Sequence, residues 1–152
     1  MLRSVLLAVH LGAGAAGLLV GPAAISAALH DRRETRAGQG YLAAVTVVTA
    51  TAVGLVALDP GALWPFVLLA AGTEAALVGA RFVDARPTHV RLVCGSYVSL
   101  VTALTVVRWG TLLAWVLPTL IGTALVEWAA SSTRRRRPAR TPSRIPTPSP
   151  RP

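Results

Sequence analysis

The sequence has no lysine, one cysteine and only six acidic residues among its 152 positions. A single cysteine excludes an intramolecular disulfide and any metal site built from cysteines alone. All 15 basic residues are arginines, and the net charge is +9. A basic chain can bind nucleic acid when its cations cluster on a folded polar surface. These arginines lie instead in gaps between long uncharged runs, so no nucleic-acid partner is predicted.

The sequence also lacks the common catalytic motifs. It contains no GxSxG nucleophile elbow, no phosphate-binding GxxxxGK[ST] loop and no HExxH zinc motif. The stretch GAGAAG at 12–17 lies inside an apolar run without a preceding strand, so it is a poor dinucleotide-binding fingerprint. Cys94 lies in another apolar run, where a thiol is expected to be inert. The motifs therefore predict no enzyme.

Long hydrophobic runs are the dominant feature that is present. Hydrophobic residues make up 53% of the chain, against about 45–50% in soluble domains even with glycine counted. None of the runs shows the polar face of an amphipathic helix, and a helix needs about 17–25 apolar residues to cross the hydrocarbon core of a membrane. We therefore predict an all-α, polytopic transmembrane helical bundle. Its five predicted spans are residues 4–29, 41–58, 62–80, 90–107 and 111–130.

Two other interpretations of these runs were weighed. Buried core helices of a soluble protein would leave almost no residues for a polar exterior. The first run could be a cleaved signal peptide, because Arg3 precedes an apolar stretch rich in small residues. That run continues to Leu29, beyond the usual apolar region of a signal peptide, which favours an uncleaved first helix.

The arginines divide unequally between the two predicted sides of the membrane. The segments after the first and third runs hold three each, and the C-terminal tail holds seven. The other side has only Arg3 and Arg108. Since cytoplasmic loops carry the excess of positive charge, we predict a bacterial inner (plasma) membrane protein with its N-terminus outside and its C-terminus in the cytoplasm.

The C-terminal tail, predicted as residues 131–152, is basic, proline-rich and free of apolar periodicity. Such a segment is expected to be disordered or locally polyproline II. Arginines beside a span can bind anionic lipid headgroups, each contributing about 1 kcal/mol near the surface. A membrane anchor whose tail recruits a partner or anionic lipid is therefore an alternative function. The predicted lipid-binding residues are Arg134, Arg135, Arg136 and Arg137.

Glu74 is the most informative single residue. A carboxylate at membrane depth costs several kcal/mol unless it is paired, protonated or hydrated. At 1.5 Å per helical residue, the depths of Glu74 and His10 differ by about 6 Å, so the two could pair if their helices touch. Handling of protons or a small solute through His10 and Glu74 is the leading hypothesis. The structural alternative is a Glu74 bonded to a threonine or a backbone carbonyl.

The histidines suggest a redox alternative. His10 and His30 are separated along one predicted helix by about 30 Å, so they cannot share a metal whose ligand bonds are about 2 Å. His30 and His89 both lie on the predicted cytoplasmic side and could meet, with Arg91 and Tyr97 nearby. The leading hypothesis involves no cofactor. The alternative function is a membrane redox protein in which His30 and His89 hold a haem b. Homo- and hetero-oligomers both remain open.

The remaining charges predict ion pairs at the two membrane surfaces. Asp59 and Arg108 share the outer side, and Glu127 lies at the depth of Arg81 and Arg91 on the inner side. Exposed pairs of this kind contribute little to stability.

Small residues and prolines predict how the helices pack. Gly17 and Gly21 form a GxxxG pair, which allows close helix contact in lipid. Pro22 and Pro118 interrupt their helices, and the carbonyls they free could face a polar site or a neighbouring helix.

A resemblance to a known family rests on four segments, HLGAGAAGLLVGPAAI (His10–Ile25), GQGY (Gly38–Tyr41), HVRLVCGSY (His89–Tyr97) and VVRW (Val106–Trp109). Together they resemble an uncharacterised bacterial integral membrane family, catalogued as domain of unknown function twenty-three-oh-six. The resemblance covers about residues 5–109 and implies a four-helix core, here with a fifth helix appended, and no known activity. Glu34, Thr35 and Gln39 depart from the family's basic positions. The residues that fit are His10, Gly14, Gly21, Pro22, Gly38, Tyr41, His89, Arg91, Ser96, Tyr97 and Arg108.

Overall fold

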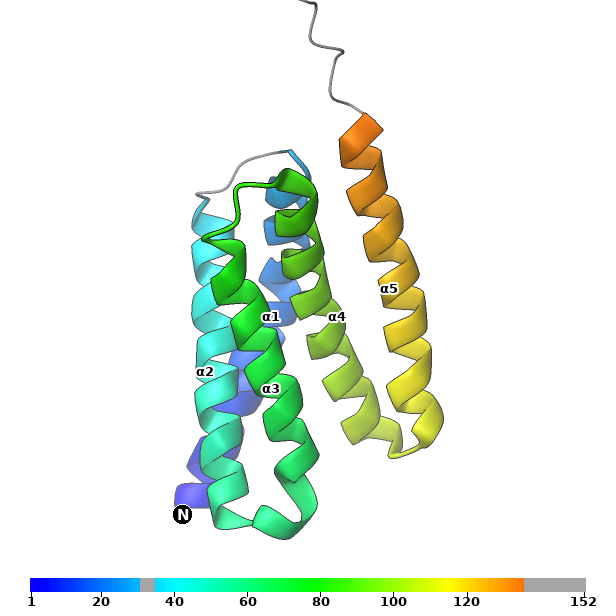
Figure 1. The fold of residues 1–152 in the computed structure, drawn as a ribbon. Helices are drawn as coiled ribbons and strands as arrows, with labels where there is room; N and C mark the ends of the chain where they lie inside the picture. Colours follow the sequence, from blue (N-terminus) through cyan, green and yellow to red (C-terminus); the bar gives the residue numbers. More distant parts are fainter. Residues whose placement is uncertain (31–34, 136–152) are drawn as a thin grey trace, which may run out of the picture.

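The computed structural model describes residues 1–30 and 35–135, and within them every secondary-structure element is helical. The prediction of an all-α bundle of five helices is confirmed (Figure 1). The helices are α1 (Leu2–Leu29), α2 (Arg36–Leu58), α3 (Pro60–Ala80), α4 (Arg86–Trp109) and α5 (Leu112–Arg135).

Local chemistry sets the helix ends, and it moves several of them from their predicted positions. Helix α2 begins before residue 41 because Thr35 caps it, accepting a hydrogen bond from the Gly38 amide at 3.1 Å. Helices α3 and α4 have a proline in their first turn, where the missing N–H costs nothing. Gly110 ends α4 at a φ of 62°, a left-handed conformation that glycine adopts without strain.

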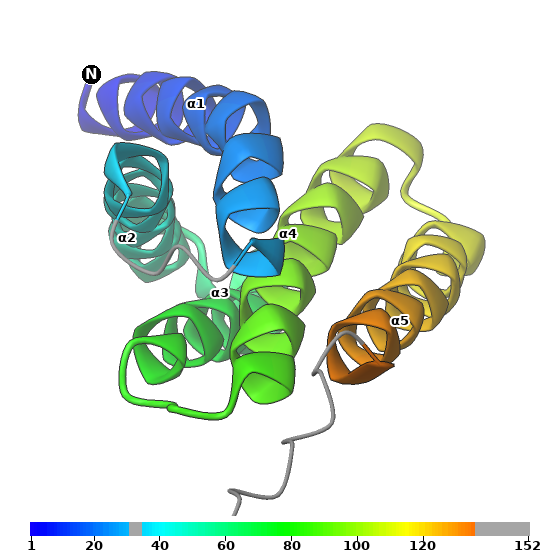
Figure 2. The same cartoon turned by 90° about the horizontal axis from the view of Figure 1, so that it is seen from above.

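The first four helices form a ring in which each packs against two neighbours (Figure 2). Helix α1 contacts α2 and α4, and α3 contacts the same two helices. Consecutive helices run in opposite directions, and α5 lies outside the ring against α4 (Figures 1 and 2). This is a four-helix core with a fifth helix at its edge.

The core is concentrated at the end of the ring where α1 and α3 finish and where α2 and α4 begin. We call this the arginine-rich end, because Arg36, Arg81, Arg86 and Arg91 lie there. Small side chains let the helix backbones approach closely at such contacts. The buried core residues are Ala24, Ala28, Tyr41, Val45, Leu77, Ala80, Val90, Val93, Cys94 and Leu100.

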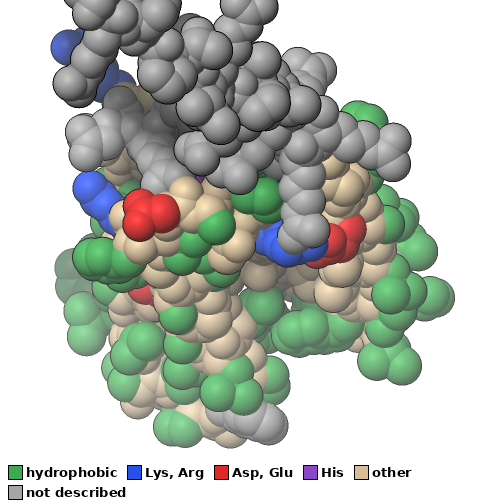
Figure 3. Space-filling model, turned by 45° about the horizontal axis from the view of Figure 1, so that its top comes forward, with side chains coloured by type: hydrophobic (Ala, Val, Ile, Leu, Met, Phe, Trp, Pro, Cys, Tyr) green, Lys and Arg blue, Asp and Glu red, His purple; other side chains and the backbone are tan. Residues whose placement is uncertain are grey.

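The outward faces of the helices are apolar. Leu19 is 82% exposed and Leu112 is 80% exposed, and contiguous exposure of this kind is rare in water-soluble proteins. Four helices are long and apolar enough to cross a membrane, and α3 contributes a shorter apolar stretch, Pro65–Ala80. In Figure 3 the part of the molecule below the blue and red side chains shows hydrophobic side chains among uncharged tan atoms, apart from one small acidic patch. These are properties of membrane-spanning helices.

The predicted start of the tail is corrected. Helix α5 continues through Arg135, so 131–135 belongs to the helix rather than to a disordered segment. Arg134 and Arg135 lie in that helical backbone. Arg136, Arg137 and the rest of the predicted tail lie outside the described residues.

Candidate functional site

Pro22 leaves one backbone carbonyl of α1 without its helical hydrogen bond, and Tyr97 of α4 donates a hydrogen bond to it. Proline has no N–H, so the Leu18 carbonyl four residues earlier loses its helical partner. The Tyr97 hydroxyl donates to that carbonyl at 3.3 Å. Gly21 makes the approach possible, because a Cβ atom there would lie 2.4 Å from two ring carbons of Tyr97. Of the two predicted fates for a freed carbonyl, contact with a neighbouring helix is the one observed.

A second tyrosine completes this cluster. Tyr41 and Ser96 are both 0% exposed, and their hydroxyl oxygens are 3.1 Å apart. Ser96 donates to the Val93 carbonyl at 2.8 Å, so Tyr41 is the donor to Ser96. The rings of Tyr41 and Tyr97 are 6.4 Å apart. We call Gly21, Pro22, Tyr41, Ser96 and Tyr97 the tyrosine cluster.

His10 is held against α2 near the opposite end of the ring. Its Nδ1 lies 2.9 Å from Thr51 Oγ1 and 3.2 Å from the Val48 carbonyl oxygen. A carbonyl only accepts, so Nδ1 carries the proton and donates. Thr51 accepts this bond because its own hydroxyl donates to the Val47 carbonyl at 2.7 Å. Nε2 is therefore the ring atom with a free lone pair.

Glu74 bonds to α2 as well, but through different residues. Thr46 donates to one carboxylate oxygen at 2.8 Å, and Thr49 lies 3.5 Å from the other. His10 uses Val48 and Thr51, which at 3.6 residues per turn lie on nearly the opposite side of α2. Helix α2 therefore separates the two groups, and the predicted His10–Glu74 pair is not formed. The threonine-bonded Glu74 of the structural alternative is what the structure shows.

The two histidines of the arginine-rich end are each bonded to backbone. His30 Nδ1 lies 2.8 Å from the Ser26 carbonyl oxygen, and His89 Nδ1 lies 2.8 Å from that of Ala80. No described contact joins His30 to His89, and the described residues contain no group of three or more potential metal-ligating side chains. A haem b between these histidines stays a hypothesis.

One predicted ion pair is confirmed and one is wrong. Arg91 makes a two-pronged contact with Glu127, with Nε and Nη2 at 2.8 and 2.6 Å from its two carboxylate oxygens. This links α4 to α5, and Arg81 is not the partner. Asp59 lies 3.8 Å from Arg3 rather than pairing with Arg108, because α1 begins beside the short α2–α3 link.

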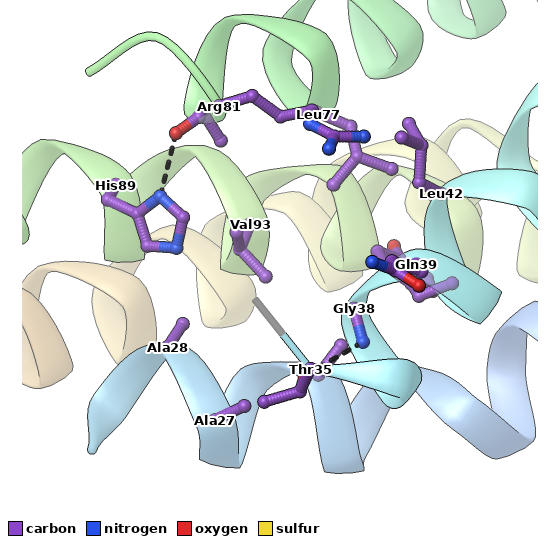
Figure 4. Close-up of a pocket in the computed structure, with 13 residues that line it drawn as sticks. Ala27, Ala28, Thr35, Gly38, Gln39, Leu42, Leu77, Arg81, His89 and Val93 are labelled. Atoms are coloured by element: carbon purple, nitrogen blue, oxygen red, sulfur yellow. Dashed lines mark hydrogen bonds between the residues drawn. The ribbon is translucent and has the colours of Figure 1, made fainter. Parts of the chain in front are cut away.

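Sequence reasoning missed two features of the arginine-rich end. Arg86 donates from Nη2 to the Leu29 carbonyl at the end of α1, so α4 caps the neighbouring helix. A cavity of about 170 Å³ opens among α1, α2, α3 and α4 (Figure 4). The available signal was the set of small residues at the ends of these helices, such as Ala27, Ala28 and Ala80.

No family model, no curated protein and no solved structure matches this chain. The resemblance to domain of unknown function twenty-three-oh-six therefore stays a prediction. Function has to be inferred from the geometry of the residues above.

Proposed function

We propose that this chain is a multi-pass protein of a bacterial inner membrane that handles protons, or a small solute coupled to them, through His10 and Glu74. The two residues act as separate intramembrane groups rather than as a pair. We also propose membership of the family of domain of unknown function twenty-three-oh-six. In support, the tyrosine cluster draws its members from three of the four segments that carry the resemblance.

The arrangement of charge supports five crossings with the N-terminus outside. Arg3 and Arg108 lie at one end of the helices, and the arginine-rich end lies at the other. Helix α3 runs antiparallel to both of its neighbours over a similar height (Figure 1). The positive-inside rule then assigns the arginine-rich end to the cytoplasm.

The observation that carries the proposal is the fixed hydrogen bonding of His10. Because Nδ1 is committed to Thr51 and Val48, only Nε2 can take up or release a proton without breaking a helix contact. Histidine is the side chain suited to proton exchange near neutral pH. The side chain is half-buried on α1 rather than enclosed in the ring, so a proton carrier can reach it.

Glu74 supplies a second ionisable group at membrane depth. Two threonine hydroxyls face its carboxylate across the α2–α3 contact, and such donors reduce the cost of a polar group in lipid. The same hydroxyls could pass a proton or hydrogen-bond a small polar solute. Glu74 is only half-buried, so it remains accessible from outside the ring.

Proton flux into liposomes tests the proposal. We expect purified full-length protein to dissipate an imposed pH gradient faster than protein-free liposomes do. His10→Gln retains an N–H donor for Thr51 but cannot be protonated, so most of the added flux should be lost. Glu74→Gln should reduce it partly, while the matched control His30→Gln should leave it unchanged. Equal fluxes for wild type and His10→Gln, or for wild type and empty liposomes, would contradict the proposal.

A further inference from the structure

The cavity at the arginine-rich end is large enough for a small ligand. Its volume is about 170 Å³, whereas a single water needs about 10–15 Å³ measured in this way. It lies where the first four helices converge, among the ends of α1 and α3 and the beginnings of α2 and α4. Alanines and a glycine line much of it, so the helices meet there without filling the space.

The lining of the cavity has charge of one sign. Among the described residues that line it, Arg81 is the only charged one, and none is an aspartate or a glutamate. Within the described part of the chain, Arg81 takes part in neither of the two ion pairs, Arg3–Asp59 and Arg91–Glu127. In this part of the chain, neither pair occupies its guanidinium, which could therefore serve an anion from outside the protein.

Neutral hydrogen-bonding groups complete the lining. Because His89 Nδ1 donates to the Ala80 carbonyl, its second ring nitrogen carries the lone pair of the neutral imidazole and is a hydrogen-bond acceptor, and it points toward Val93 and the interior of the cavity (Figure 4). Gln39 extends its amide from α2 on the side nearer Leu42 (Figure 4). The buried Tyr41 lies deeper, with its hydroxyl already committed to Ser96.

We propose that this cavity binds a phosphate group, with Arg81 as its charge partner and the Gln39 amide as a hydrogen-bond donor. Guanidinium groups recognise phosphate oxygens through two parallel N–H bonds, and none of the described lining residues carries a carboxylate that would repel the anion. The phosphate can belong to a lipid headgroup or to a soluble phosphate compound, since both present the same oxygens. The site is independent of His10 and Glu74, which do not line this cavity.

Thermal unfolding of the full-length protein in detergent tests this site. One arm adds inorganic phosphate, and the other adds phosphatidylglycerol against phosphatidylcholine. We expect a ligand-dependent rise in the unfolding midpoint, as for any ligand that binds only the folded state. A rise with inorganic phosphate identifies a soluble source, and a rise with phosphatidylglycerol alone identifies a lipid headgroup.

Variants then tie the effect to the cavity. Arg81→Gln should weaken binding at least tenfold, because it removes the one charge among the described lining residues. Arg108→Gln removes the same charge at the opposite end of the helices and should bind like wild type. Ala27→Leu, which fills the cavity without changing charge, should also abolish the rise. A rise that survives in Arg81→Gln, or no rise with either ligand in wild type, would overturn the proposal.

Discussion

The ring of helices α1–α4 and the appended helix α5 are both apolar, but they differ in the contacts that join each helix to its neighbours. In the most apolar window of each helix, the buried share of residues is 39% for α4, 22% for α2 and 11% for both α1 and α5, so burial does not distinguish α5 from the ring, and the bonds between helices do. The ring contains the buried Tyr41–Ser96 bond and the Tyr97–Leu18 bond. Helix α5 packs mainly on α4, where Gly122 contacts Val98 and the exposed Arg91–Glu127 pair forms a bridge.

The difference follows from the solvent. In lipid, burying a leucine against another helix gains little, because lipid tails are as apolar as leucine itself. Close packing at small residues and hydrogen bonds between helices are what remain to hold a bundle together. The ring has both in the tyrosine cluster, whereas the described contacts of α5 include one close glycine contact, one surface ion pair and a tilted aromatic contact between Trp115 and Phe66 of α3, whose ring centroids are 5.6 Å apart. We expect the ring to be the stable unit and α5 to separate from it more readily.

The largest effect should come from Gly21→Ala, which disrupts the ring. The added Cβ would lie 2.4 Å from the Tyr97 ring and 3.4 Å from Tyr41, and overpacking of this kind typically costs about 1–3 kcal/mol. Unfolding in a detergent titration measures the loss. Gly12→Ala is the matched control on the same helix, because a Cβ at Gly12 meets nothing within 4 Å. Equal stabilities for the two variants would show that the cluster does not hold the ring.

A smaller effect is expected from Tyr97→Phe, which removes only the hydroxyl that bonds to Leu18. A hydrogen bond of this type contributes about 0.5–1.5 kcal/mol. In a Pro22→Ala background, residue 22 regains an N–H that can bond to the Leu18 carbonyl. Tyr97→Phe should then cost much less. The same unfolding titration measures this double-mutant cycle. If Tyr97→Phe lowered the stability equally in both backgrounds, the hydrogen bond from Tyr97 to the carbonyl freed by Pro22 would be contradicted.

The sequence could predict features that depend on position along a helix. Uncharged runs predicted five helices, the depth of Glu127 predicted a partner at Arg81 or Arg91, of which Arg91 is the one observed, and Pro22 predicted a freed carbonyl. Features that depend on rotation about a helix axis were beyond it. His10 and Glu74 have similar depths, yet α2 lies between them.

The cavity could not be predicted for a related reason. It forms where four helix ends meet with small residues facing one another. The residue pattern of one helix does not predict where the ends of the other three lie. Arg81 is recognisable from the sequence as one of several arginines near a predicted membrane surface, but only the fold distinguishes it from Arg86, which caps α1. The sequence shows the chemical type of each residue, but it does not show which residues the fold brings together.

The smallest effect should come from Arg91→Gln, which removes the bridge to α5 and leaves the ring intact. Both partners are partly exposed, with 37% and 54% of the side chains accessible, and exposed pairs are weak and screened by salt. The unfolding midpoint should fall by no more than a few degrees. Proximity of α5 to α4, measured by cross-linking of cysteines placed at Val98 and Gly122, should fall more clearly. Adding 1 M salt to the wild type should reproduce part of that loss, because it shortens the screening length to about 3 Å. A large drop in midpoint together with unchanged cross-linking would mean that α5 is part of the stable unit, and the distinction between ring and appended helix would then fail.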